Sequence, residues 1–492
     1  MIVVGAGLSG IGAALRLRSS RPGSSLAVLE ARSTLGGTWD LFRYPGVRSD
    51  SDMYTLGYRL RPWRHDRALA DGSEILGYLR ETARETGVGE LIRYDHRVVG
   101  AQWSTATARW TVTVQRDDGS GELRLSCRFL FVCSGYYRYD AGHTPDLPGV
   151  ERFAGPVVHP QAWPADLDHR GRRVVVLGSG ATAVTLVPAL AAEAEHVTMM
   201  QRSPGYVGVL ARTDRWARRL QRRLPGRLAY GLLRWKYLLG AMVAFQLSRR
   251  RPERMKSLLR HVAASRLPAD FDIDRHFTPS YDPWDQRLCF AADGDLFAAL
   301  RSGRASVVTD RVETVHAGGL TLASGAELPA DILVTATGLR LLLLGGMELT
   351  VDGRPVTLGE LLAYRGMMAA GVPNAAFTLG YTNASWTLKS DLVAGYVCRL
   401  LDHLDRREYA SVTPVPPAGA ERWATSPLID LTAGYVLRDV HLMPRQGPRS
   451  PWRLHQNYLR DLLTLRFGSL RRGVRFVPLG PVRSESQADA PV

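Results

Sequence analysis

Cysteine is scarce in this chain of 492 residues, and the few cysteines do not group. They form no CxxC pair and do not follow the spacing of zinc ligands; the four are Cys127, Cys133, Cys289 and Cys398. This pattern argues against a disulfide oxidoreductase and against a metal site, so we expect no bound metal. It favours a reducing compartment, and we expect the protein in the cytoplasm.

Long apolar runs are missing as well. In the basic region 215–264 the longest charge-free apolar stretch is Tyr237 to Leu247, which is well short of the roughly 20 residues that cross a bilayer. This region interleaves basic and apolar residues, which indicates a helical insertion and is compatible with a helix lying on a membrane surface. The first apolar run is followed by glycine and does not have the form of a signal peptide. Because Met1 precedes Gly5 by only four residues, either the first strand is short or the natural start lies upstream.

Lysine is rare, and the excess of positive charge is carried almost entirely by arginine. The formal net charge is +16, while hydrophobic residues make up 45% and charged residues 22% of the chain, as in an ordinary globular protein. A composition rich in arginine and alanine is typical of GC-rich coding, so we expect no nucleic-acid partner. The basic excess either forms a solvated surface or attracts an anionic cofactor or an anionic lipid.

Glycine is plentiful where the chain turns near its N-terminus. The sequence Gly5-Ala-Gly7-Leu-Ser-Gly10 follows an expected strand and precedes an expected helix over 11–18. Gly5 permits the tight bend, Gly7 lets the backbone approach a pyrophosphate, and Gly10 lets the helix pack close to the strand. The pyrophosphate would lie at the helix N-terminus, beside the amides around Ser9.

An acidic residue, Glu30, ends the second expected strand, 25–29. It stands twenty residues after Gly10, where dinucleotide-binding βαβ units place an acid. A carboxylate there accepts hydrogen bonds from a ribose diol and repels a 2′-phosphate, which favours FAD over NADP. We therefore predict an FAD site at the first glycine turn.

A second βαβ unit begins at the expected strand 173–177. Its second strand, 196–200, ends at Gln201-Arg202-Ser203, so Arg202 stands where the first unit has its acid. A guanidinium there can pair with the 2′-phosphate of NADP, and its position favours this role over that of one surface arginine among many. We predict an NADP site formed by Arg202, Ser203 and the turn Gly178, Ser179, Gly180, Ala181, Thr182 and Ala183.

Two further segments would lie near a flavin. The adjacent glycines of Gly36-Gly37-Thr38-Trp39 allow the backbone to lie against the flavin, and Trp39 could cover a face of its ring. The stretch 43–50 contains a Pro-Gly turn that would place Arg48 and Asp50 side by side near the ring. Taken alone, that stretch is equally a polar turn with a surface ion pair.

The order of these segments predicts an α/β protein with two Rossmann-like dinucleotide-binding domains, one for FAD and one for NADP. We expect residues 1–150 and 330–480 to form the FAD domain, and residues 151–329 to form the NADP domain with a helical insertion over about 208–270. The strands 129–133 and 331–335 each run into a glycine, and both look like elements that return the chain to the flavin domain. Residues 481–492 are polar, and we expect a disordered tail.

A twelve-residue segment between the two glycine turns has the form FxGxxxHxxxWP, with Phe153, Gly155, His159, Trp163 and Pro164 at its fixed positions. This is the fingerprint of the type I Baeyer–Villiger monooxygenases, which are class B flavoprotein monooxygenases, and the chain resembles that family. Related flavin-containing monooxygenases that oxidise amines and sulfides usually carry another residue at the Trp163 position. Four longer stretches resemble an actinobacterial branch that acts on a thioamide: 36–46, 178–188, 283–289 and 380–389.

The resemblance implies roles for individual residues. Asp50 corresponds to the family's aspartate near the flavin, and Arg287 corresponds to its catalytic arginine. His159 and Trp163 lie in an interdomain linker in the family, and we favour a packed hinge without direct chemistry over a catalytic role. Many relatives have lysine before the catalytic arginine, whereas Gln286 stands there in this chain, which weakens the case for a strict preference for NADPH.

The predicted contacts of each cofactor can be stated by residue. FAD is expected to contact Gly5, Gly7, Ser9, Gly10, Glu30, Gly37, Thr38, Trp39, Asp40, Leu41 and Asp50. NADP is expected to contact Arg48, Gly178, Ser179, Gly180, Ala181, Thr182, Ala183, Arg202 and Ser203.

The resemblance also implies a reaction. NADPH reduces FAD, O2 adds to the flavin to give a peroxide, and the peroxide attacks a ketone, which becomes an ester or a lactone. Arg287 would stabilise the peroxide and the oxyanion, and Asp50 would position Arg287. Oxidation of sulfides or thioamides is an expected second activity.

Three alternatives stay open. The protein could act mainly on sulfur or nitrogen centres, or it could be an NADPH oxidase that releases hydrogen peroxide. It could also be a flavin-bound sensor at a membrane surface that uses the basic insertion 215–264.

Overall fold

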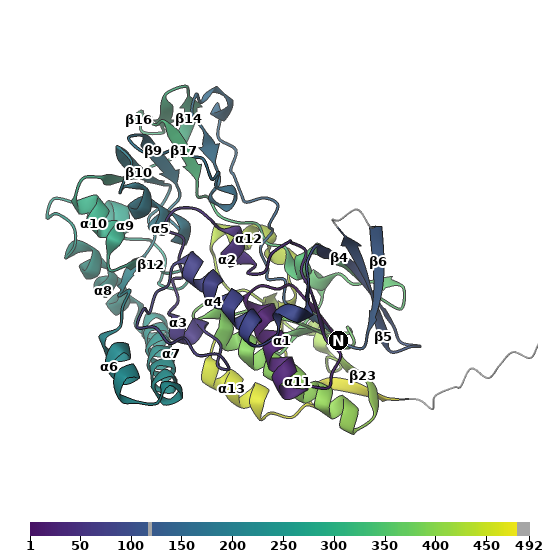
Figure 1. Ribbon diagram of the computed structural model, residues 1–492. Coiled ribbons are helices and arrows are strands. Elements are labelled where there is room, and N and C mark those ends of the chain that lie inside the picture. Colours follow the sequence, from purple (N-terminus) through teal and green to yellow (C-terminus); the bar gives the residue numbers. More distant parts are fainter. Residues whose placement is uncertain (117–120, 480–492) are drawn as a thin grey trace, which may run out of the picture.

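The first sheet is built from strands that lie far apart in the chain. The computed structural model describes residues 1–116 and 121–479 (Figure 1). In it five parallel strands take the order β22-β7-β1-β2-β3. Their bounds are β1 Ile2–Val4, β2 Ala27–Leu29, β3 Ile92–Arg93, β7 Leu130–Val132 and β22 Ala375–Phe377. The expected tail over 481–492 lies outside the described residues.

Alternate residues of β1 face two different hydrophobic cores. Val3 packs into the core formed with the helices α1 (Leu8–Ser20) and α11 (Trp386–Arg406). Ile2 and Val4 pack on the other side, into the core that contains Trp103 and Trp110. Because both faces are covered, the strands are continuous apolar runs, as in other parallel sheets.

An antiparallel sheet supplies the second of these cores. Its order is β19-β18-β4-β5-β6, and its bounds are β4 His96–Ser104, β5 Arg109–Arg116, β6 Gly121–Cys127, β18 Glu348–Val351 and β19 Arg354–Pro355. Three two-stranded ribbons complete this half: β20 Ala363–Tyr364 with β21 Met368–Ala369, β23 Tyr409–Pro414 with β26 Val474–Pro478, and β24 Ser426–Pro427 with β25 Arg445–Gln446. The remaining helices are α2 Thr38–Leu41, α3 Met53–Leu56, α4 Gly72–Glu85, α12 Gly434–Asp439 and α13 Tyr458–Arg466. We call this half the first unit.

The second unit is a parallel sheet of the order β13-β10-β9-β17-β8. Its strands are β8 Val157–Val158, β9 Arg173–Leu177, β10 His196–Gln201, β13 Ala305–Thr309 and β17 Ile332–Thr335. The helices α5 (Ala181–Leu190) and α10 (Asp295–Arg301) pack together, and an antiparallel meander adds β14 Val312–His316, β15 Gly319–Leu322 and β16 Glu327–Pro329. The α/β class with two Rossmann-like units, predicted from the sequence, is confirmed.

The position of β17 corrects one expected boundary. This strand, which we expected to return the chain to the flavin domain from residue 330, pairs in parallel with β9, and Ile332 lies opposite Val174. The chain therefore leaves the second sheet only after Thr335. Both β7 and β17 are followed by a glycine and have the same local sequence pattern. The pattern therefore does not show which of the two sheets each strand joins.

The helical insertion of the second unit lies between two paired strands, β11 (Val207–Leu210) and β12 (Cys289–Ala292). It contains α6 Arg215–Arg223, α7 Gly226–Arg250, α8 Pro252–Ala264 and α9 Ile273–Phe277. Over residues 1–116 and 121–479, no helix combines the length and the apolar character that crossing a membrane requires.

Two connecting segments run side by side between the units. Their backbones pair in an antiparallel manner, with amide-to-carbonyl distances of 2.9 Å from Leu342 to Tyr136, 2.9 Å from Arg138 to Arg340 and 3.0 Å from His143 to Gly338. The outgoing segment, 136–143, leaves the first unit, and the returning segment, 338–342, leads back to it. The two segments therefore form one two-stranded linker.

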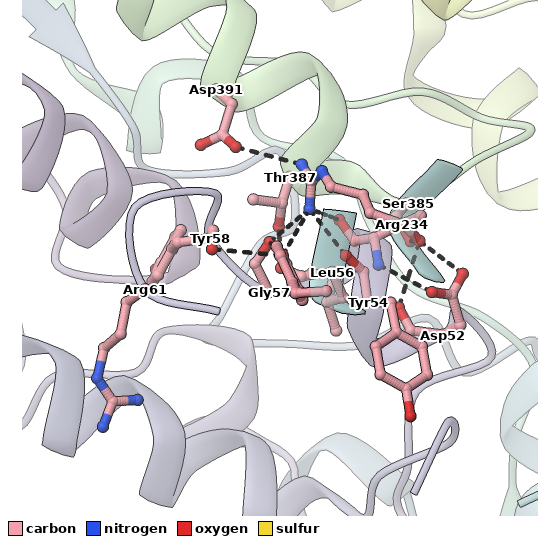
Figure 2. Close-up of polar contacts among 12 residues, drawn as sticks. Asp52, Tyr54, Leu56, Gly57, Tyr58, Arg61, Arg234, Ser385, Thr387 and Asp391 are labelled. Carbon is pink, nitrogen blue, oxygen red and sulfur yellow. Dashed lines mark hydrogen bonds and ion pairs between the residues drawn. The ribbon is translucent and has the colours of Figure 1, made fainter. Parts of the chain in front are cut away.

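Arg234 of α7 fastens the insertion to the first unit (Figure 2). Its Nη1 donates at 2.9 Å to the carbonyls of Tyr54 and Gly57 and to the hydroxyl of Tyr230. Its Nη2 donates to the carboxylate of Asp391 on α11 at 3.3 Å. Burial raises the pKa of Asp391, and the charge of Arg234 opposes that effect.

The variant Arg234→Met should loosen α7 from the first unit. It removes the donors to two carbonyls and leaves the Asp391 carboxylate without its cation, so we expect the free energy of unfolding to fall by about 3 kcal/mol. Urea unfolding followed by tryptophan fluorescence measures this change. Arg219→Met, on the exposed side of α6, is the matched control, and equal midpoints for the two variants would contradict the assignment.

Candidate functional site

The first glycine turn is tightly closed. Gly5 has a φ of +97°, and a Cβ there would lie 2.9 Å from the carbonyl oxygen of Cys133. A Cβ on Gly10 would lie 1.8 Å from the carbonyl oxygen of Gly5, so α1 approaches the strand as closely as only glycine allows. Among the described residues no side chain caps α1, and its first turn carries no acid. Its N-terminal amides are therefore suited to an anion such as a pyrophosphate.

Glu30 lies directly after β2, where the sequence places it. Its carboxylate accepts hydrogen bonds from the backbone amides of Ala6 at 2.7 Å and Arg32 at 3.0 Å. The residue is buried, and burial raises the pKa of the carboxyl group. The carboxylate thus holds the turn, and each oxygen keeps a second lone pair that could accept from a ribose, which stays a prediction.

The loop 36–41 packs against the first turn. The amide of Gly36 donates to the carbonyl of Ala6 at 3.0 Å, and a Cβ on Gly37 would lie 3.0 Å from the Cα of Gly7. The hydroxyl of Thr38 lies 3.2 Å from that of Tyr139. The two predicted FAD segments therefore form one surface.

The polar side chains at this surface bind other side chains of the protein. Asp40, which together with Leu41 lies on α2, is buried and pairs with Arg32 at 2.7 Å. Trp39 is half-buried against the first core. The hydroxyl of Ser9 accepts from Nε1 of Trp386 at 2.7 Å, which links the turn to the start of α11.

Arg287 and Asp50, predicted as the catalytic pair, meet in a bidentate ion pair. Nη2 of Arg287 lies 2.9 and 2.7 Å from the two carboxylate oxygens of Asp50, and Nε lies 3.0 Å from Oδ2. Asp50 comes from the first unit, and Arg287 comes from the loop before β12 of the second. Attraction to Asp50 holds the pKa of Arg287 well above its usual value, so the guanidinium stays charged.

Three tyrosines lie near this pair, and our sequence reasoning missed all of them. Tyr136, Tyr137 and Tyr435 lie close enough to interact with the charge of Arg287. The hydroxyls of Tyr136 and Tyr137 are 3.0 Å apart, and the ring of Tyr136 stacks on Trp386 with 5.3 Å between centroids. The Tyr-Tyr doublet after Gly135 was an available signal, but nothing near Tyr435 in the chain points to the site.

Arg48 does not share the ion pair of Asp50. Its guanidinium is buried and donates at 2.6 and 3.1 Å to the two carboxylate oxygens of Asp295, at the start of α10. The two charged residues of the stretch 43–50 thus bind different partners in the second unit: Arg48 binds Asp295, and Asp50 binds Arg287. A contact between Arg48 and NADP stays a prediction.

The second glycine turn repeats the close approach of the first. Gly178 has a φ of +135°, and a Cβ there would lie 2.3 Å from the carbonyl oxygen of Ala336. The helix α5 begins at Ala181 and includes Thr182 and the buried Ala183, and among the described residues no side chain caps it. The hydroxyl of Ser179 donates to the carbonyl of Ser203 at 3.4 Å. Gly180, Arg202 and Ser203 are exposed beside this turn.

The fingerprint segment lies where the two connecting chains meet. Nε2 of His159 donates to the carbonyl of Gly338 at 3.1 Å, and its Nδ1 accepts from the amide of Gln161. Burial lowers the pKa of His159, so the neutral ring is favoured. The amide of the Gln161 side chain donates to two carbonyls of the outgoing linker.

The other fixed positions of the fingerprint pack into the second unit. Phe153 is buried in its own small core, and Trp163 packs against the main core of this unit. A Cβ on Gly155 would lie 2.0 Å from the carbonyl oxygen of Asp331. These three positions are therefore packed within the second unit, and the hinge role of the segment stays a prediction.

Comparisons with known proteins agree with this geometry. Residues 64–255 match the family of flavin-binding monooxygenase-like proteins, and residues 3–61 match the NAD(P)-binding Rossmann-like domain. The chain is 50% identical to the FAD-containing monooxygenase EthA of Mycobacterium tuberculosis, over 97% of each chain. It is 44% identical to a probable FAD-binding monooxygenase, AlmA, of Acinetobacter baylyi, over 96% of this chain and 95% of that one. A solved structure of steroid monooxygenase bound to NADP shares the fold, with a TM-score of 0.76 at 22% identity over 97% of this chain and 99% of that one.

The close approach at Gly10 leads to a test of the first turn. In Gly10→Ala the new Cβ would overlap the carbonyl oxygen of Gly5, which forces the turn open, and we expect flavin binding to weaken by at least about tenfold. The flavin content of the purified protein and titration of the apoprotein with FAD measure this loss. Gly23→Ala, where no atom lies within 4 Å of the added Cβ, is the matched control. Full flavin content in both variants would refute the role of the turn.

Proposed function

The chain belongs to the FAD-containing flavin monooxygenases, and we propose that it inserts one oxygen atom of O2 into ketones to give esters or lactones. Oxidation of sulfides and thioamides is the proposed second activity of the same site. The observation that carries the proposal is the bidentate ion pair between Arg287 and Asp50, which joins the two units. The protein is an NADPH-dependent enzyme, and its cofactors are FAD and NADPH.

The residues present fit both cofactors. The first turn, Glu30 and the loop 36–41 would hold FAD, and the second turn with Arg202 and Ser203 would hold NADPH. In both turns glycine is required by a backbone contact, and the helix that follows has no side-chain cap among the described residues. When bound, FAD supplies the redox chemistry that transfers electrons from NADPH and activates O2.

Arg287 would act on the substrate carbonyl. Its charge does not depend on pH in the working range, and its planar group has donors left after two of them bind Asp50. A donor directed at the carbonyl oxygen would stabilise the negative charge that develops there. Asp50 would fix the plane of the guanidinium, because both carboxylate oxygens hold it.

The tyrosines would reduce the contact of this group with water, although the Arg287 side chain is still 37% exposed. Burial raises the pKa of Tyr136 and Tyr435, so both phenols stay protonated and neutral. A neutral, largely apolar wall strengthens the electrostatic effect of Arg287 on a bound carbonyl. It would also admit apolar ketones and sulfides rather than charged substrates.

Two alternative activities of the same site can be distinguished by product. An enzyme that acts mainly on sulfur or nitrogen would oxidise sulfides and leave ketones unchanged. An uncoupled NADPH oxidase would release one hydrogen peroxide for each NADPH with every substrate. Trp163 and the complete fingerprint support the ketone reaction.

We place the reaction in the cytoplasm, at or near a membrane surface that the basic insertion contacts. The four cysteines are free and buried, which suits a reducing compartment. His159 and the fingerprint segment would act as the joint about which the units move, because they hold the two connecting chains together.

The variant Arg287→Ala should separate reduction from oxygenation. Without the guanidinium, we expect ester formation to fall by roughly 10²–10³-fold, while NADPH still bleaches the flavin absorption at close to the normal rate. Asp50→Asn, which keeps the size and loses the charge, should give a smaller loss. Product analysis on linear, cyclic and aromatic ketones, together with stopped-flow absorption, measures both steps. Ester formation by Arg287→Ala at the wild-type rate would overturn the proposed role.

Arg202 can be tested through cofactor preference. In Arg202→Gln the partner of the 2′-phosphate is lost, so kcat/KM for NADPH should fall by roughly tenfold or more while that for NADH changes little. Gln286→Lys adds a cation at the position where many relatives carry lysine, and it should raise the preference for NADPH. Equal losses with NADPH and NADH in Arg202→Gln would show that Arg202 does not read the phosphate.

A further inference from the structure

The helix α7 has one face that is firmly attached to the first unit. The hydroxyl of Tyr230 donates to the carbonyl of Gly57 at 3.1 Å, and Arg234 binds the same segment (Figure 2). Leu233 and Leu238 are buried on this face. These contacts hold the helix in one orientation, so the residues on its opposite face are presented in a defined direction.

That opposite face is apolar and open to solvent. Six large side chains repeat at intervals of three or four residues along α7 and are between 39% and 67% exposed: Leu228, Leu232, Trp235, Leu239, Val243 and Leu247. They fall within about 120° of the helix circumference and extend over about 28 Å. We call this row the α7 stripe.

A second apolar row lies on α13, on the same edge of the molecule as α6 and α7 (Figure 1). Leu459 and Leu463 are exposed on α13 and Phe467 is exposed directly after its last residue; because the three are four residues apart, they lie on one side. Trp235 of the α7 stripe meets Tyr458 of α13 edge to face, with 6.3 Å between centroids. The two rows therefore border one surface.

A groove of about 580 Å³ runs between the two helices. Its apolar lining includes Leu60, Trp235 and Leu462, and Arg59, Arg227 and Arg466 stand around it. Within the described part of the chain, none of these three exposed arginines forms an ion pair within 4 Å; Arg59 interacts with the charge of Asp391 at longer range, and Arg466 lies over the ring of Phe467. A groove with an apolar floor and guanidinium groups around it suits an anionic amphiphile.

The charge around the stripe is predominantly positive, and acidic residues from other segments pair with Arg218, Arg234, Lys236, Arg249 and Arg260. Residues 215–264 contain fourteen arginines and lysines and a single acidic residue, Glu253, which pairs with Lys256. The arginines 219, 222 and 223 on α6 are exposed, and among the described residues they too lack an acidic partner. Two copies of this face would repel each other, whereas an anionic surface would attract it.

We propose that the α7 stripe and the α13 row form a docking face for an anionic lipid bilayer. The apolar side chains would enter the boundary between headgroups and acyl chains, and the surrounding arginines would bind lipid phosphates. The groove would receive a headgroup between Arg59, Arg227 and Arg466. The helix would lie parallel to the surface, since the described chain has no helix suited to crossing a membrane.

Co-sedimentation of the FAD-loaded enzyme with lipid vesicles tests this face. We expect binding to phosphatidylcholine vesicles that contain phosphatidylglycerol, little binding to phosphatidylcholine alone, and weakening by added salt. The double variant Leu239→Ser with Val243→Ser should bind at least about tenfold more weakly. Arg227→Gln with Arg466→Gln should bind more weakly and depend less on salt.

Matched controls lie on other faces. Val477→Ser on β26 and Arg301→Gln on α10 remove an exposed apolar side chain and an exposed arginine, and they should bind as the wild type does. NADPH-dependent bleaching of the flavin should persist in all variants, which separates this test from that of the oxygenation reaction. Equal binding to both kinds of vesicle, or unchanged binding by the stripe variant, would overturn the proposal. A dimer that the stripe variant dissociates, without vesicle binding, would assign the face to a second copy instead.

Discussion

The ion pair between Arg287 and Asp50 joins two units of the molecule, and the proposed chemistry depends on that junction. Neither unit contains both partners, so the guanidinium has its orientation only when the units are in contact. Other pairs cross the same boundary. Arg48 of the first unit binds Asp295 of the second, while Arg234 and Arg212 of the second unit bind Asp391 and Asp71 of the first. The site therefore depends on a set of arginine–aspartate ion pairs between the two units. These pairs fix the position of one unit relative to the other and do not determine the fold of either unit.

The connecting chains limit how this position can change. The outgoing and returning segments pair with each other, and His159 and Gln161 tie the fingerprint segment to both. A rotation of one unit relative to the other would bend the two-stranded linker and would leave both sheets intact. His159 binds the returning chain and Trp163 packs against the core of the second unit, so the contacts of both side chains are structural in this arrangement.

Short sequence patterns predicted those parts of the candidate site that are formed by residues close together in the chain. The glycine turns, the acid after β2 and the arginine after β10 follow from the geometry of a βαβ unit, and the structure has them within a residue or two of the expected places. The partner of Arg48 could not be predicted in this way, because Asp295 reaches it only through the packing of the units. Tyr435 is another such case, since α12 comes near Arg287 only after the chain has returned to the first unit. The error at β17 has the same origin: pairing between distant strands decides which sheet a strand joins.

The attachment of α7 through Arg234 has a mechanical consequence. In the chain the insertion belongs to the unit with the second glycine turn, but its main helix is fastened to α3 and α11 of the other unit. If the units were to separate, these contacts would keep α7 with the first unit, and the chain would have to bend where the insertion joins its own sheet, near β11 and β12. The sheet of the second unit and the helix that carries the exposed row are therefore attached to each other less directly than their order in the chain suggests, because α7 packs as part of the first unit.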